Sequence, residues 1–101
     1  NVNVPVQLDI VPIGAAACSE RAAATICNIS EDGALLRDVR IDKGYIPSER
    51  FELIIEAESA PLSAWRARGD IVRFERDDGL AAGVRFTEIS RADIEKIRVF
   101  S

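Results

Sequence analysis

The chain has 101 residues, of which 48% are hydrophobic and 30% are charged, and its formal net charge is −4. This length and composition are typical of one folded globular domain and leave no room for two separate cores. The acidic balance argues against a protein that binds nucleic acid polymers, and no apolar run approaches the ~20 residues that span a bilayer.

Period-two alternation predicts two strands in the first third of the chain. Apolar and polar residues alternate over residues 2–10, as in a strand with one buried face. Pro5 lies among the outward positions, and its missing N–H indicates an edge or an unpaired site. A second strand is expected over residues 22–29 and runs into the sequence NISEDGALL at residues 28–36.

The middle of the chain is expected to be irregular before alternation resumes. No regular strand is predicted over residues 37–48, which include the turn signal Asp-Lys-Gly and a Pro-Ser pair. Phe, Leu and Ile alternate with polar residues over residues 51–56, which predicts another half-buried strand. Extended chain is then expected over residues 63–68 and 71–76, with a bend or bulge at Gly69.

A hairpin is predicted at the Asp-Asp-Gly sequence of residues 77–79. We expect the register that pairs Phe74 with Val84 and Val72 with Phe86, because it gathers four apolar side chains on one face of the sheet.

That register places Arg73 opposite Arg85 on the other face of the sheet. Two like charges directly opposite each other destabilise a sheet by roughly 0.2–1 kcal/mol. The acidic residues Asp70 and Glu75, or an anionic ligand, would offset this repulsion.

A short helix is predicted after a strand at residues 82–87. Ser90 is a favourable N-cap, Asp93 three residues later fits a capping box, and Ile89 with Ile94 fits a hydrophobic staple. Such a short helix needs an apolar stripe that packs on the strands. The candidates for that stripe are Ile94, Ile97 and either Val99 or Phe100.

These elements predict a mainly β protein with about six short strands and one terminal helix. A small closed barrel is favoured over an open sheet, because closure removes exposed strand edges.

The residue types present offer little for catalysis or metal binding. The chain has no histidine, so the usual general base and the Ser-His-Asp arrangement are absent. Its glycines form no phosphate-binding loop, and we expect neither an enzyme nor a catalytic residue. Cys18 and Cys27 fit no zinc spacing; two buried thiols of a cytoplasmic protein are favoured over a disulfide.

Residues 28–36 carry the strongest candidate binding residues. If residues 28–30 are extended, Asn28 and Ser30 point to the same side about 6–7 Å apart, and their polar groups suit a nucleobase edge or a phosphate. Gly33 lets the chain turn and lets a flat ring approach the backbone. A turn that merely closes the strand, with Gly33 at positive φ, is the structural alternative. From the residues alone this alternative is favoured.

The sequence NISEDGALL resembles the (D/N)-x-S-x-x-G motif of the PilZ domain family, with Asn28, Ser30 and Gly33 at the defining positions. VPVQL near the start, RGDIVRF, and AAGVRFTEIS ahead of the helix also follow the family order, so the resemblance covers essentially the whole chain. It implies a six- to seven-stranded antiparallel barrel with a short C-terminal helix. It further implies a bacterial receptor that binds cyclic di-GMP on the outer barrel surface, where the three motif residues contact a guanine and the phosphodiester.

The chain departs from the family at the R-x-x-x-R motif, which precedes the first strand and clamps the phosphates. No arginine precedes Arg21. Each lost charge-assisted contact weakens binding by ~1.5–3 kcal/mol. Arg73 and Arg85 are candidate substitutes, although a solvated outer face is the favoured interpretation of both.

Two hypotheses explain this departure. In the first, the arginines lie upstream of Asn1, because the chain has no methionine and residues 1–101 therefore read as a single domain of a longer protein. Alternatively, the chain is a divergent adaptor that binds proteins, for example in motility or pilus assembly, and not cyclic di-GMP. We favour a receptor whose ligand joins the barrel to a neighbouring domain or partner protein.

Overall fold

Six strands and one helix make up the described part of the computed structural model, which covers residues 3–12, 20–42, 51–58, 62, 64–77 and 79–100. Cys18, residues 43–48, Ser63 and Asp78 lie outside the described residues, and so do the expectations that concern them. The strands are β1 (Val4–Pro12), β2 (Glu20–Ile29), β3 (Gly33–Ile41), β4 (Phe51–Ala57), β5 (Trp65–Asp77) and β6 (Gly79–Ile89), and the helix is α1 (Arg91–Phe100).

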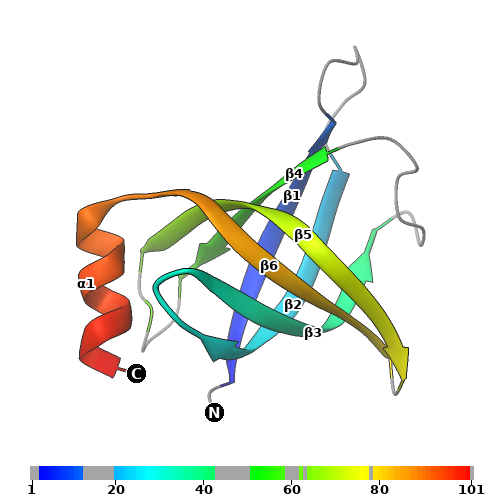
Figure 1. Cartoon of the computed structure of the whole chain (residues 1–101). Helices are drawn as coiled ribbons and strands as arrows, with labels where there is room; N and C mark the ends of the chain where they lie inside the picture. Colours follow the sequence, from blue (N-terminus) through cyan, green and yellow to red (C-terminus); the bar gives the residue numbers. More distant parts are fainter. Residues whose placement is uncertain are drawn as a thin grey trace.

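The strands close into one antiparallel barrel in the order β1-β2-β3-β6-β5-β4 (Figure 1). The expected six-stranded barrel with a short C-terminal helix is therefore confirmed. Within the described residues, no helix is both long and apolar enough to cross a membrane.

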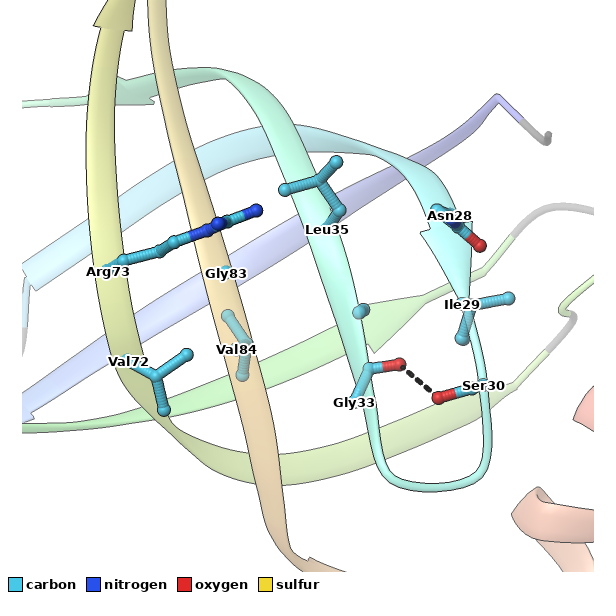
Figure 2. Close-up of a pocket in the computed structure, with 10 residues that line it drawn as sticks. Asn28, Ile29, Ser30, Gly33, Leu35, Val72, Arg73, Gly83 and Val84 are labelled. Carbon is cyan, nitrogen blue, oxygen red and sulfur yellow. Dashed lines mark hydrogen bonds between the residues drawn. The ribbon is translucent and has the colours of Figure 1, made fainter.

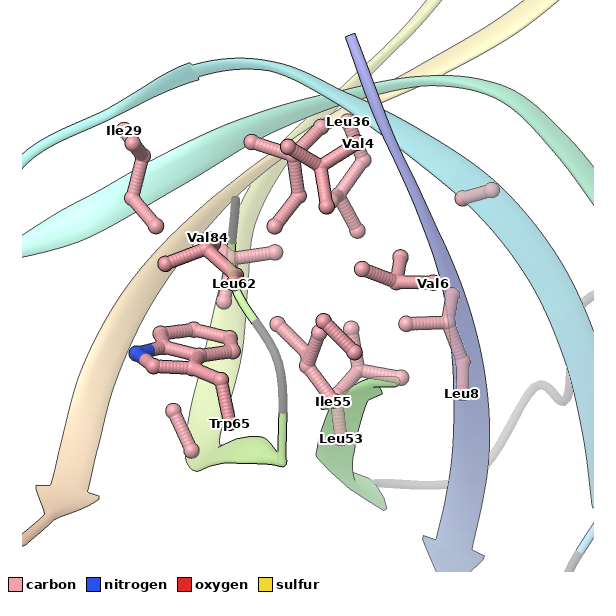
Figure 3. Packing of buried hydrophobic residues seen from close by; sticks show 14 of the residues in the cluster. Val4, Val6, Leu8, Ile29, Leu36, Leu53, Ile55, Leu62, Trp65 and Val84 are labelled. Carbon is pink, nitrogen blue, oxygen red and sulfur yellow. The ribbon is translucent and has the colours of Figure 1, made fainter. Parts of the chain in front are cut away.

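The barrel interior is apolar and nearly full. In β1 the inward residues Val4, Val6 and Leu8 are at most 4% exposed, as the alternation predicts (Figure 3). Trp65 is also buried, and its ring meets that of Phe86 edge-on with centroids 5.7 Å apart. No described polar or charged residue is buried. One interior cavity, lined by apolar residues, has a volume of about 10 Å³, which is room for about one water.

Pro5 lies where the sequence indicated an unpaired site. It pairs with Thr25 of β2, whereas the described pairing of β1 with β4 begins only at Gln7. The missing N–H of Pro5 therefore costs no hydrogen bond on the β4 side.

The expectation of irregular chain after Leu36 is wrong for the described residues, because β3 continues to Ile41. A register shift against β2 leaves an extra residue on β3, and Asp38 has a φ of 52°. Such a bulge interrupts the alternation of buried and exposed side chains. Arg37 and Asp38 are accordingly both exposed, which made the segment look irregular.

The predicted β5–β6 hairpin is present, but its expected register is wrong. Phe74 pairs with Ala82 instead of Val84, and Phe86 does not face Val72. A register shift between Ile71 and Arg73 leaves Val72 as an extra residue on β5, where its side chain is 60% exposed. A second shift lies between Arg68 and Gly69, but its extra residue is Thr87 on β6, so the bulge expected at Gly69 lies on the partner strand instead.

The two arginines are consequently not opposite each other. Arg73 pairs with Gly83, and Arg85 pairs with Asp70. The repulsion expected from the sequence does not arise in this register, and Arg73 instead forms an exposed ion pair with Glu75 at 3.7 Å.

Helix α1 begins as its capping residues predict. The Asp93 N–H donates to the Ser90 hydroxyl oxygen at 3.2 Å, and that hydroxyl donates to the Asp93 carboxylate at 2.9 Å. The Trp65 indole N–H donates to the Asp93 carbonyl at 3.1 Å, which joins the helix to β5. Ile97 is fully buried as expected, whereas Val99 is 86% exposed and does not belong to the apolar stripe.

Candidate functional site

A bulge in β2 turns the motif side chains outward. Ile26 pairs with Leu36 and Asn28 pairs with Leu35, so Cys27 is an extra residue on β2. The half-buried, free Cys27 thiol donates to the Leu35 carbonyl at 3.5 Å. If β2 were regular here, with Cys27 paired like its neighbours, the alternation that buries Ile26 would also point Asn28 inward.

After the bulge the alternation resumes in the opposite phase. Asn28 and Ser30 are exposed, and Ile29 between them is 7% exposed and belongs to the core. The amide and the hydroxyl therefore share the outer side of the barrel, as expected for an extended segment.

Ser30 and Gly33 close the turn between β2 and β3. The Ser30 N–H donates to the Gly33 carbonyl at 2.9 Å, and the Ser30 hydroxyl donates to the same oxygen at 3.4 Å (Figure 2). The Asp32 N–H also donates to the Ser30 hydroxyl oxygen at 3.3 Å. Ser30 thus stabilises the turn, which is the structural role considered for this motif.

The need for a glycine at position 33 comes from strand packing and not from a positive φ. Among the described glycines, only Gly79 has positive φ, so the positive φ expected for Gly33 is wrong. Gly33 pairs with Arg85, and a Cβ atom on Gly33 would overlap the Val84 carbonyl oxygen of β6. A side chain here would push β3 away from β6.

The motif residues line a hollow of about 510 Å³ on the outer surface of the barrel (Figure 2). We call it the motif hollow; Asn28, Ser30, Gly33 and Arg73 all contribute to its lining. Of the five candidate site residues, the structure thus brings four together. Arg85 lines a separate hollow beside it.

Arg73 reaches the motif hollow by crossing a glycine. Its side chain leaves β5, passes over Gly83 of β6 and points toward Leu35 of β3 (Figure 2). A Cβ atom on Gly83 would lie 3.2 Å from Arg73 Cγ and 3.4 Å from Nε. The sequence singled out Arg73 by its charge but missed Gly83, although a glycine inside a strand often marks a close approach.

A second feature missed from the sequence joins the motif turn to α1. Arg98 Nε donates a hydrogen bond to the Glu31 carboxylate, and Arg98 Nη1 donates to Glu95 at 2.9 Å. The hydrogen bond to Glu31, with the negative charges of Glu31 and Glu95, raises the pKa of Arg98 above its ordinary value. The turn that carries Ser30 is therefore held against the C-terminal helix.

One of three comparisons with known proteins found a match. A family model described as "PilZ domain" matches residues 6–101, a range that contains the motif turn, Arg73 and α1. The comparison with curated proteins and the comparison with solved structures gave no match.

Proposed function

Because the chain belongs to the PilZ domain family, a family of cyclic di-GMP-binding domains, we propose that it is a cyclic di-GMP receptor domain of a bacterial signalling protein. The observation that carries this proposal is the convergence of Asn28, Ser30, Gly33 and Arg73, from separate strands and a turn, on one exterior hollow. The buried residues of the described barrel are all hydrophobic, which supports an exterior site for a polar ligand as well.

In this proposal different residues of the motif hollow bind different parts of the ligand. The Asn28 amide offers donors and an acceptor to a guanine edge, and the exposed Ser30 offers its hydroxyl. The Arg73 guanidinium supplies charge-assisted hydrogen bonds to a phosphodiester. Its exposed ion pair with Glu75 contributes little by itself, so a phosphate competes with it readily.

The proposed consequence of binding is a change in how the barrel contacts its surroundings. Members of this family are binding or adaptor domains, and the proposal assigns this chain no catalytic residue and no cofactor. A ligand that also contacts a neighbouring domain or partner protein favours the arrangement in which that contact forms. We place this function in the cytoplasm.

A protein-binding adaptor is the second candidate function. The observation that favours it is that the motif has a structural explanation without a ligand. The Ser30 hydroxyl already bonds within the turn, and Gly33 is required for the approach of β6. The exposed Val72 side chain on β5 would suit a protein contact.

Titration of the chain with cyclic di-GMP, followed by amide NMR, distinguishes the two functions. For a receptor we expect the amide signals of Asn28 and Ser30 to shift with ligand. Asn28→Ala should weaken binding about two- to tenfold, the effect of losing one hydrogen bond. Glu88→Ala is the matched control, because Glu88 is exposed and lines neither the motif hollow nor the hollow beside it.

If millimolar cyclic di-GMP shifts no signal of the folded chain, the receptor proposal is rejected and the adaptor remains. If Asn28→Ala and Ser30→Ala both bind as the unchanged chain does, the ligand binds somewhere other than the motif hollow.

A further inference from the structure

A second hollow of about 510 Å³ lies beside the motif hollow and shares Val72 and Arg73 with it. Arg73 therefore stands between two hollows of similar size on β5. The lining of the second hollow also includes Asp70 and Arg85, which pair across β5 and β6, and the rings of Phe51 and Phe74.

The strand pairing explains why this hollow exists. The described pairing of β4 with β5 ends at Leu53 and Gly69. Beyond Gly69, the described pairing of β5 is with β6 alone. The bulge at Val72 lies in this part of β5, and the Val72 side chain is 60% exposed. The hollow thus lies where β5 has left β4 and bulges against β6.

Two charged side chains in this hollow, those of Asp70 and Arg85, are available to a ligand. Among the residues that the structure describes, neither the Asp70 carboxylate nor the Arg85 guanidinium makes a hydrogen bond or ion pair. Asp70 is half-buried and Arg85 is exposed. Phe74 is 38% exposed, so an aromatic surface is accessible beside them.

We propose that the second hollow binds the second guanine of a cyclic dinucleotide whose first guanine occupies the motif hollow. This inference rests on the proposed function and extends it to a second set of residues. A cyclic dinucleotide carries two bases around a ring with two phosphates, and Arg73 lies between the two hollows, where a cation suits that ring.

The chemistry of the second hollow favours guanine over adenine. A carboxylate only accepts hydrogen bonds, and the Watson–Crick edge of guanine offers N1–H and N2–H donors to Asp70. Adenine lacks both donors. Arginine donates to guanine O6 and N7, a role that Arg85 fills. The exposed ring of Phe74 offers a stacking surface, which contributes to binding without regard to base identity.

The test compares cyclic di-GMP with cyclic di-AMP in titrations of the folded chain. Asp70→Ala should weaken cyclic di-GMP binding about tenfold or more, the usual effect of losing a bidentate base contact, and should leave cyclic di-AMP binding unchanged. Asp70→Asn should reduce the ratio of the affinity for cyclic di-GMP to that for cyclic di-AMP, because one acceptor oxygen becomes a donor NH₂ group. Glu88→Ala again serves as the control.

Phe74→Leu gives an independent signature. It keeps an apolar side chain at this position but removes the stacking surface, so it should weaken both dinucleotides to a similar degree, about fivefold or more. Thermal unfolding of each variant checks that the barrel is intact. One dinucleotide should bind per chain, because both of its bases are used.

The outcomes separate this inference from the proposed function. If Asn28→Ala weakens cyclic di-GMP binding while folded Asp70 and Phe74 variants bind normally, the second hollow is not a base site and the receptor function stands. Two dinucleotides per chain would also overturn the inference. Failure of the unchanged chain to bind cyclic di-GMP overturns both.

Discussion

At the scale of single residues, the reach of Arg73 depends on the absence of a side chain at Gly83. A Cβ atom there would lie 3.2 Å from Arg73 Cγ, so the arginine side chain would have to shift by a few tenths of an ångström from its path across β6. We expect Gly83→Ala to weaken cyclic di-GMP binding by up to about tenfold, because the shift of Arg73 loses part of a charge-assisted hydrogen bond that contributes ~1.5–3 kcal/mol when fully formed. Titration calorimetry measures this loss.

A double-mutant cycle shows whether the loss passes through Arg73. In an Arg73→Ala background, Gly83→Ala should have no further effect on affinity, whereas equal losses in both backgrounds would contradict the explanation. Stability should not fall, because alanine restricts the unfolded chain more than glycine does. A lower melting temperature for Gly83→Ala would instead indicate a packing defect.

Residue roles were predictable only where the reason for the residue is local. The extended segment correctly placed Asn28 and Ser30 on the same side, whereas their outward direction comes from the bulge at Cys27, which the sequence did not predict. Gly33 was assigned to a turn with positive φ, yet its role is set by the Val84 carbonyl on a strand far along the chain. The predicted register placed Arg85 opposite Arg73, and the bulge at Val72 changes that register.

At the scale of elements, the contact between the motif turn and α1 rests on Arg98 and Glu31. Both side chains are substantially exposed, so the pair should contribute little to global stability and more to local order. We expect Arg98→Ala to leave the melting temperature nearly unchanged and to accelerate amide exchange at Ser30, whose N–H closes the turn. Thermal unfolding measures the melting temperature, and hydrogen-exchange NMR measures the exchange at Ser30.

Arg91→Ala is the matched control for this prediction, because Arg91 is an exposed arginine at the other end of the same helix. Salt near 1 M should reproduce the Arg98→Ala effect, since it screens exposed charges. Unchanged exchange at Ser30 in the Arg98 variant would mean that the backbone bonds alone hold the turn.

Elements with uninterrupted local patterns were predictable, and those with bulges were not. β1, β4 and the start of α1 follow from alternation and from the Ser90 cap. The predictions of where β3 ends and of how β5 pairs with β6 failed near Asp38 and Val72, where an extra residue breaks the alternation. Bulges are fixed by pairing with the neighbouring strand, which a local pattern does not contain.

At the scale of the whole molecule, barrel closure was predictable and the strand order was not. Short alternating strands with no covering layer must hide their edges, and a barrel does so. The order that places β6 between β3 and β5 depends on which residues meet after folding. That order brings Arg73 on β5, Gly83 on β6 and Leu35 on β3 to one surface.

The stability of this closed barrel should depend strongly on Trp65, which is 1% exposed and bonds α1 to the strands. Replacing a buried tryptophan by alanine costs ~3–5 kcal/mol, a large part of the ~5–15 kcal/mol that stabilises a typical domain. We therefore expect Trp65→Ala to lower the urea midpoint sharply, measured by far-UV circular dichroism because the chain has one tryptophan. Trp65→Phe keeps an aromatic ring against Phe86 and should cost less, although it leaves the Asp93 carbonyl without its indole donor. A loss below ~1 kcal/mol for Trp65→Ala would mean that the helix and the strands are stabilised separately, and not by one shared core.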